Sequence, residues 1–241
     1  MLFSKSKSDD VTVVAMLASA LRRDISFGTL RPDQKLKIEE LRQRYGGSNH
    51  SMRETLRMLG AEGLVESTAQ RGFRVTSATE DDLRDVMQVR IEIERTGLEW
   101  SLKHGDVHWE GRVMAAHHAL RKSERDVREN PDDLTALQWD EASRAFYASL
   151  IEASGSPRLI GLQQKFFDQS RRYRLALLRE AKLDFDRRTE RQKNLVEAVL
   201  ARDIAAALNA LTEEIEAEIR GEAEIHITKT KQYKLKSGRK L

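Results

Sequence analysis

The chain contains no cysteine among its 241 residues. This absence excludes disulfides, thiolate zinc sites and thiol nucleophiles together, and it is compatible with a reducing compartment. We therefore expect a cytoplasmic protein whose chemistry rests on hydroxyl, amide, imidazole, guanidinium and carboxylate groups.

Long apolar runs are absent as well, and none approaches the roughly 18 residues of a membrane span. The nearest is residues 11–20, VTVVAMLASA, which is similar to the apolar core of a signal peptide. Acidic residues precede it where a signal peptide carries base, and apolar residues continue at helical spacing through Leu21 and Ile25. We expect an amphipathic helix here and no association with a membrane.

Proline occurs only three times, and each proline follows residues typical of a turn. Because proline interrupts helices, the long proline-free segments after Thr79 predict successive helices, and none of them reads as a convincing strand. We expect an all-α antiparallel helical bundle with helices near 80–103, 107–129, 132–154, 157–182, 184–201 and 203–224.

Residues 11–78 have a different pattern. It predicts a helix over about 11–26, a turn at Pro32, a second helix over 38–45, and a third helix that begins at Ser48 or Ser51. A Ser-x-x-Glu capping box formed by Ser51 and Glu54 favours the later start. Apolar pairs on either side of residues 70–72 predict two short strands joined by a tight turn. The fold class is therefore mainly α, with a winged helix-turn-helix of three helices plus a two-stranded wing before the bundle.

The net charge of +3 conceals an uneven distribution. Lys and Arg exceed Asp and Glu by 13 to 9 in residues 1–78 and by 6 to 0 in residues 226–241, whereas acids exceed bases by 30 to 23 in residues 79–225. This division favours contact of the N-terminal part with a polyanion, although a chance fluctuation explains an excess of this size equally well. We expect an N-terminal extension (1–10), a DNA-binding domain (11–78), a helical domain (79–225) and a disordered basic tail (226–241).

The third predicted helix has two unlike faces. Met52, Leu56 and Leu59 form an apolar stripe, and polar side chains point away from it. Arg and Asn bond guanine and adenine edges in the major groove, whereas serine suits phosphate oxygens. We expect the DNA contacts to come from this helix and the following wing tip, namely Ser48, Asn49, His50, Ser51, Arg53, Gln70, Arg71 and Gly72. An ordinary solvated helix face remains the alternative. For His50, a pH switch or a metal ligand is a further interpretation.

Residues 14–75 resemble the DNA-binding domain of the GntR family of bacterial transcriptional regulators. The resemblance lies in the segments LRP (30–32), IEEL (38–41), SMRETL (51–56), EGLV (62–65) and RGFRV (71–75). It implies that the third helix reads the major groove and that the wing tip approaches the minor groove. Asn49 stands where the family usually carries an arginine that contacts DNA, whereas Arg53 matches.

Residues 80–220 resemble the all-helical effector domain of the FadR-like (FCD) branch of that family. Among the matching features are Arg90 followed by Glu94, the Trp139-Asp140 pair and the segment 198–203, AVLARD. The resemblance implies a helical bundle around a small-molecule pocket, in which many members hold a divalent metal through one Asp and three His.

In register, the four metal positions are Ser143, Tyr147, Gln192 and Glu214. A hydroxyl, a phenol and an amide are poor ligands for zinc or a similar ion beside a single carboxylate. We therefore predict a pocket with no metal and no cofactor. These four residues, with Arg90, would instead orient a small polar effector, and a carboxylate suits the guanidinium. Alternatively, Arg90 pairs with Glu94 one turn later and the former metal positions form hydrogen bonds in the core.

We expect a homodimeric, sequence-specific regulator that acts on double-stranded operator DNA, a repressor of metabolic genes relieved by a small organic acid. Thr76 to Thr79 would serve as the hinge. A regulator without an effector, an enzyme with an appended DNA-binding domain and a nonspecific nucleoid protein are the alternatives. No Ser/His/Asp order, phosphate-binding glycine loop or paired-acid motif supports catalysis. The basic tail would add salt-sensitive attraction to DNA, although a solubilising tail or a cloning remnant fits it as well.

Overall fold

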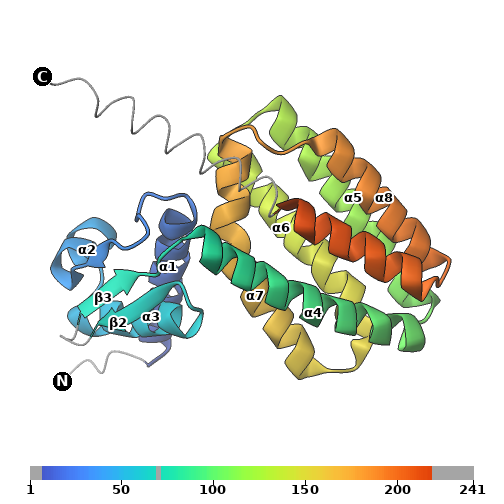
Figure 1. Ribbon diagram of the computed structural model, residues 1–241. Coiled ribbons are helices and arrows are strands. Elements are labelled where there is room, and N and C mark those ends of the chain that lie inside the picture. The colour runs from blue at the N-terminus through green and yellow to red at the C-terminus, as the bar shows by residue number, and fades with distance from the viewer. Residues whose placement is uncertain (1–6, 69–71, 219–241) are drawn as a thin grey trace, which may run out of the picture. The chain divides into compact units, whose positions relative to one another are not determined.

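The computed structural model describes residues 7–68 and 72–218, with side chains from residue 13 onward except that of Thr68 (Figure 1). The chain forms two compact units that divide between Thr79 and Glu80. The expected basic tail and part of the expected N-terminal extension lie outside the described residues.

The N-terminal unit contains three helices and a small sheet. Its elements are α1 (Lys7–Ser26), β1 (Lys35–Leu36), α2 (Ile38–Tyr45), α3 (Asn49–Ala61), β2 (Val65–Thr68) and β3 (Gly72–Val75). The sheet is antiparallel in the order β1-β3-β2, so the wing has three strands where the sequence predicted two. The third strand escaped prediction because its two residues are too few to show a period. Only the pairing of Lys35 with Arg74 and of Leu36 with Phe73 defines it.

The turn between α2 and α3 depends on two glycines. Gly46 and Gly47 both adopt left-handed backbone angles, with φ of 80° and 82°. A Cβ atom on Gly47 would lie 2.9 Å from Cδ1 of Leu17 on α1. Glycine is therefore required here for backbone angle and for close packing alike. This turn sets the angle at which α3 leaves α2.

The core of the winged unit lies between α1, α3 and the sheet. Leu21, Met52, Leu56 and Leu59 are completely buried, as the apolar stripe on α3 predicted. Asp24, buried near the end of α1, connects α1 to α2. It accepts hydrogen bonds from Tyr45 Oη at 2.5 Å and from Arg44 at 2.8 Å.

The C-terminal unit is a helical bundle, as predicted. Its helices are α4 (Glu80–His104), α5 (Val107–Glu129), α6 (Asp133–Ile151) with the short η1 (Glu152–Ser154), α7 (Pro157–Arg179), α8 (Phe185–Leu200) and a last helix over residues 204–218. Turns of two to five residues join them, so consecutive helices run antiparallel. The predicted last helix extended to 224, and residues 219–224 lie outside the described part of the chain.

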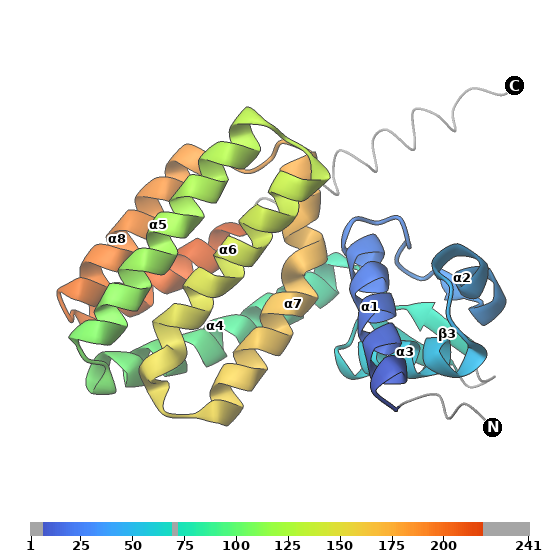
Figure 2. The same cartoon turned by 180° about the vertical axis from the view of Figure 1, so that it is seen from behind.

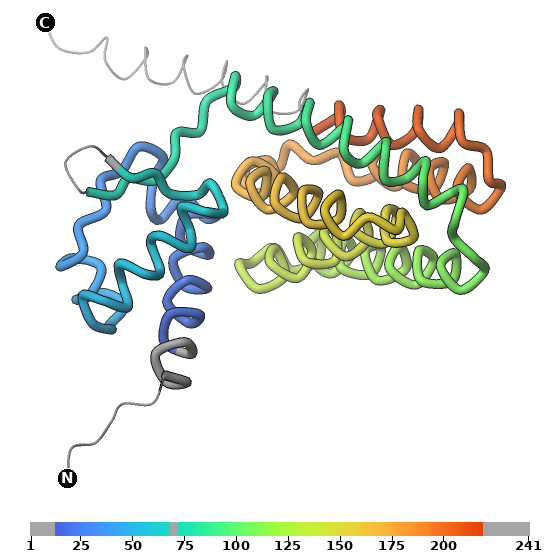
Figure 3. The backbone as a smooth tube through the Cα atoms, turned by 90° about the horizontal axis from the view of Figure 1, so that it is seen from below, coloured from blue at the N-terminus to red at the C-terminus, as the bar shows by residue number. Residues whose placement is uncertain are grey.

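The bundle closes into a ring of helices. Seen from behind, α5 lies between α8 and α6, and α7 packs against both α6 and α4 (Figure 2). The last helix runs beside α4, where Arg95 donates to the carbonyl oxygen of Leu208 at 3.0 Å and to Thr212 Oγ1 at 2.8 Å (Figure 3). On its other side, Gln192 of α8 bonds Glu214. The effector pocket predicted from the sequence would lie in the interior of this ring.

Local side-chain caps explain where the bundle helices start. Asp106, Asp132, Ser156 and Asp184 each accept a hydrogen bond from the backbone N–H three residues later. Pro157 then occupies the first turn of α7, where its missing N–H costs nothing. No helix in the described ranges 7–68 and 72–218 is long and apolar enough to cross a membrane.

Replacing Asp24 by asparagine is expected to lower the free energy of unfolding of the winged unit by about 1 to 2 kcal/mol, because a buried charged acceptor becomes neutral. All three tryptophans (100, 109 and 139) belong to the bundle. Urea titration followed by far-UV circular dichroism should therefore show the change, and tryptophan fluorescence should not. The control is Glu40→Gln in an exposed pair with Lys37, which should change stability far less than Asp24→Asn does. Equal effects of the two variants would contradict the role of Asp24.

Candidate DNA interface and bundle interior

Helix α3 begins with a reciprocal cap. Ser48 Oγ accepts from the backbone N–H of Ser51 at 3.0 Å, and Ser51 Oγ accepts from the backbone N–H of Ser48 at 2.8 Å. The predicted box between Ser51 and Glu54 is therefore wrong, and the earlier of the two predicted starts is the correct one. Ser51 is also buried, with 3% of its surface exposed. This burial removes its hydroxyl from the predicted phosphate contacts, since the cap already uses it.

The outward face of α3 carries the remaining predicted contacts. Ser48, Asn49, His50 and Arg53 are all exposed. Arg57 lies on the same face, with 66% of its side chain exposed and an ion pair to Glu54. The sequence prediction missed Arg57, although Asn49, Arg53 and Arg57 follow one another at four-residue spacing, which places them in one row along a helix. This row provides one amide and two guanidinium groups.

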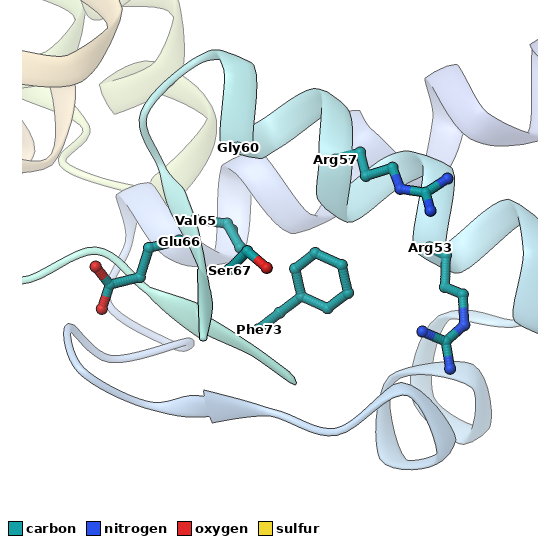
Figure 4. Close-up of a pocket in the computed structure, with 7 residues that line it drawn as sticks. All are labelled: Arg53, Arg57, Gly60, Val65, Glu66, Ser67 and Phe73. Carbon is teal, nitrogen blue, oxygen red and sulfur yellow. The ribbon is translucent and has the colours of Figure 1, made fainter. Parts of the chain in front are cut away.

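A surface groove runs between α3 and the wing (Figure 4). It has a volume of about 710 Å³, and Arg53 and Arg57 form its helical side. Phe73 of β3 lies between the strands and these arginines, whereas the Glu66 carboxylate points away from them. Cationic groups therefore border the groove on the side that α3 presents to solvent.

The predicted wing-tip contacts are only partly described by the structure. Gly72 is the first residue of β3 and pairs with Thr68 across the wing. Gln70 and Arg71 lie outside the described residues. Their proposed roles rest on their positions in the sequence between β2 and β3.

In the bundle, three of the four former metal positions meet at Glu214. Its carboxylate accepts hydrogen bonds from Tyr147 Oη at 3.2 Å and from Gln192 Nε2 at 3.4 Å. Ser143, one turn before Tyr147, donates instead to the carbonyl oxygen of Trp139 in its own helix at 2.9 Å. All four side chains are completely buried. The predicted proximity of Tyr147, Gln192 and Glu214 is therefore present in the fold.

Guanidinium groups occupy the surroundings of Glu214. Arg188 Nη1 lies 3.3 Å from one carboxylate oxygen, and Arg191 Nε lies 2.6 Å from the other. Burial raises the pKa of Glu214 more than these two arginines lower it, so its pKa stands above the ordinary value. Burial also raises the pKa of Tyr147 well above its ordinary value, so the phenol stays protonated and donates to Glu214.

The chemistry of these residues is poorly suited to binding a metal ion. Both oxygens of Glu214 are engaged by cationic groups, and an amide and a phenol are weak ligands for transition metals. Within residues 7–68 and 72–218, no three His, Cys, Asp or Glu side chains are placed to hold an ion. Tyr147 and Gln192 thus form hydrogen bonds around one carboxylate, and Ser143 bonds its own helix.

Arg90 is held by carboxylates within the bundle. It is completely buried, and its Nε donates to Glu94 at 2.9 Å while Nη1 donates to Glu218 at 3.3 Å. Burial alone would lower the pKa of Arg90, but Glu94 and Glu218 outweigh it and raise the pKa. The pairing with Glu94 that competed with an effector role is therefore present.

Other buried charges of the bundle were missed from the sequence. The fully enclosed pairs are Arg188 with Glu124 at 3.3 Å, Arg188 with Glu218 at 3.2 Å and Arg174 with Asp140 at 2.8 Å. Helical spacing held a signal for two of these residues, because Arg188 stands four residues before Gln192 and Glu218 stands four residues after Glu214. Residues one turn from a buried polar side chain share its face of the helix.

The fold and the outward face of α3 define the chain as a winged-helix DNA-binding protein with a helical second domain. Residues 14–75 match the gntR family of bacterial regulatory proteins, and residues 85–217 match the FCD domain. The chain belongs to the gntR family, and it is a DNA-binding transcriptional regulator of the type that carries an FCD domain.

Relatives with names in the same class extend over much of the chain. The HTH-type transcriptional repressor GlaR of Escherichia coli (strain K12) is 34% identical over 191 residues, which are 78% of this chain and 85% of the relative. The HTH-type transcriptional regulator BphR of Paraburkholderia xenovorans (strain LB400) is 38% identical over 154 residues, covering 64% of this chain and 62% of the relative.

Solved structures share the fold at lower identity. E. coli McbR/YncC has a TM-score of 0.71 at 18% identity and covers 89% of this chain and 98% of its own. A GntR transcriptional regulator from Rhodococcus sp. RHA1 has a TM-score of 0.68 at 22% identity, with 88% and 98% covered.

We expect Arg53→Ala and Arg57→Ala to weaken binding to a selected operator by at least about tenfold, because each removes a guanidinium that can bond a base edge or a phosphate. Fluorescence anisotropy against operator and random duplexes measures both affinity and its salt dependence. Loss of a base contact reduces the preference for the operator, whereas loss of a phosphate contact weakens both duplexes and lowers the salt slope by about one.

The matched control for these variants is Arg128→Ala, which removes an exposed, paired arginine from the bundle. It should leave DNA affinity within about twofold of the unchanged protein. Unchanged affinity after Arg53→Ala would remove this residue from the interface.

Protein purified without added metal should contain no stoichiometric zinc, nickel or manganese, because Tyr147, Gln192 and two arginines already engage Glu214. Elemental analysis by mass spectrometry checks this expectation. One equivalent of any of these metals that chelators remove, with a change in melting temperature, would contradict it.

Proposed function

We propose that the protein is a homodimeric repressor that binds a two-fold symmetric operator through α3 and the wing of each subunit. The observation that carries this proposal is the exposed row of Asn49, Arg53 and Arg57 behind the Ser48 cap. The N–H groups in the first turn of a helix favour a phosphate oxygen. With a phosphate bound there, the row would lie along the floor of the DNA major groove. DNA binding places the site of action in the cytoplasm.

Individual roles follow from side-chain chemistry. Arg53 and Asn49 suit purine edges, since each offers two bonding atoms in one plane. Ser48 and His50 stand at the start of the helix, where they suit phosphates or a neighbouring base. Gln70, Arg71 and Gly72 at the wing tip would approach the minor groove, as the family resemblance implies. Repression is supported by the name of the repressor GlaR, which is 34% identical.

We further propose that a small organic acid binds in the bundle and releases the operator. The support is the polar interior formed by Arg90, Ser143, Tyr147, Gln192 and Glu214, in which guanidinium groups lie beside a carboxylate that an acidic ligand can replace. An effector shifts the population only by its difference in affinity between two arrangements of the dimer. The acid would therefore have to bind more tightly to the arrangement that does not fit both half-sites.

A second candidate is a regulator without a small-molecule effector. The engagement of both Glu214 oxygens and the pairing of Arg90 with Glu94 favour it, because these groups are then a structural core.

Selection of genomic fragments by the purified protein, followed by release assays with a panel of metabolite acids, distinguishes the two candidates. The effector hypothesis predicts that one acid lowers operator affinity at least about tenfold while its neutral amide does not. Operator binding that no acid changes would support the second candidate. Equal affinity for all duplexes would overturn sequence-specific regulation altogether.

A further inference from the structure

A cavity opens at one end of the bundle, where the turn after α7 meets α8 and the last helix. Its volume is about 420 Å³, and its charged lining consists of Lys182, Asp184, Arg187, Arg188, Arg191, Glu213 and Glu218. None of the residues chosen from the sequence lines it, but Arg188 and Arg191 both bond Glu214 of the predicted cluster. We propose that this cavity binds the carboxylate group of the effector, an inference that rests on the proposed function.

Two cationic side chains of the cavity have hydrogen-bond donors without a partner among the described residues. Arg188 is 2% exposed, and its Nη2 atom has no hydrogen-bond partner among the described residues. Lys182 Nζ is likewise enclosed without a hydrogen bond in this part of the chain, and Glu180 lies 3.6 Å away. A buried cation without full hydrogen bonding is costly, and an oxyanion in the cavity would satisfy both donors.

The turn that carries Lys182 is closed by backbone hydrogen bonds. Its backbone N–H donates to the carbonyl oxygen of Leu177 at 3.0 Å, and Ala181 adopts a left-handed φ of 51°. This arrangement closes the end of α7 and places Lys182 at the cavity wall. The backbone of Lys182 therefore belongs to a closed helix end rather than to a free loop.

The lining of the cavity carries a small excess of positive charge. Four cationic side chains line the cavity against three carboxylates. Both signs have partners, because Glu218 pairs with Arg90 and Arg188, and Asp184 pairs with Arg187. The other two cations have partners outside the lining, since Arg191 pairs with Glu214 and Lys182 lies 3.6 Å from Glu180. Arg90, Arg188 and Arg174 outweigh burial and lower the pKa of Glu218, so this group stays ionised and matched within the protein. The unused hydrogen-bonding capacity at Lys182 and Arg188 is cationic.

Arg188 connects the cavity to the rest of the bundle. The same guanidinium bonds Glu124 of α5 and both Glu214 and Glu218 of the last helix. Glu218 in turn bonds Arg90 of α4, the helix that directly follows residues 76–79 in the chain. A carboxylate that competes for Arg188 therefore changes ion pairs that reach α4 within two steps.

The test measures binding of succinate to the full-length protein by calorimetry at constant ionic strength. Lys182→Gln removes the charge and leaves a polar side chain that is one atom shorter, and it should raise the Kd at least about tenfold. Lys193→Gln is the matched control on α8, since Lys193 is exposed, pairs with Glu197 and does not line the cavity. It should change the Kd less than about twofold.

Succinamide and inorganic phosphate serve as further probes. Binding of the neutral diamide as tight as that of succinate would overturn a carboxylate site, and so would tighter binding of phosphate. Equal losses in the two lysine variants, or no saturable binding of succinate at millimolar concentration, would also overturn it. Circular dichroism of each variant excludes unfolding as the cause of a loss.

Release of operator DNA is measured separately. If an acid releases the operator equally from the unchanged protein and from Lys182→Gln, the proposed effector function stands and this cavity is the wrong site. If succinate binds in a Lys182-dependent manner without releasing the operator, the site stands and the proposed regulation fails.

Discussion

The bundle depends on compensation of buried charge. Arg90, Arg174 and Arg188 are enclosed together with five acidic side chains, and removing one member of such a pair costs about 3 to 5 kcal/mol because its partner stays buried. The pairs connect different helices of the bundle. Hydrophobic packing alone would allow these helices to shift along one another. Arg188 joins α5, α8 and the last helix, and Glu218 extends the connection to α4. The helices are thereby held in one register by groups that tolerate few other arrangements.

The same requirement explains how the interior around Glu214 remains ordered. Without a positive group beside it, Glu214 would be a buried anion with no compensating charge. Here Arg188 and Arg191 supply positive charge, while Tyr147 and Gln192 supply hydrogen bonds. A guanidinium brings its charge with several fixed donors, so it satisfies a carboxylate without needing additional ligands. The interior therefore remains polar, with its buried carboxylates compensated by guanidinium groups.

The winged unit divides its polar groups between structure and contact. Ser51 and Asp24 are buried and complete the local geometry, whereas Asn49, Arg53 and Arg57 remain exposed. This division explains how a short helix can be firmly placed and still offer an open polar face. It also explains why Ser51 was misassigned from sequence, since a hydroxyl serves a helix cap and a phosphate equally well.

The sequence by itself determined the helices of both units and the buried stripe of α3. These features depend on spacing and caps within about four residues, which a linear sequence displays directly. It also determined that Tyr147, Gln192 and Glu214 belong together, through the family resemblance. Only the tertiary structure decided the pairing of β1 with β3, the bond of Tyr45 to Asp24 across 21 residues and that of Arg188 to Glu218 across 30. Partners so far apart meet only when packed helices or strands bring them together, and hydrophobic periodicity does not encode which polar groups then face each other.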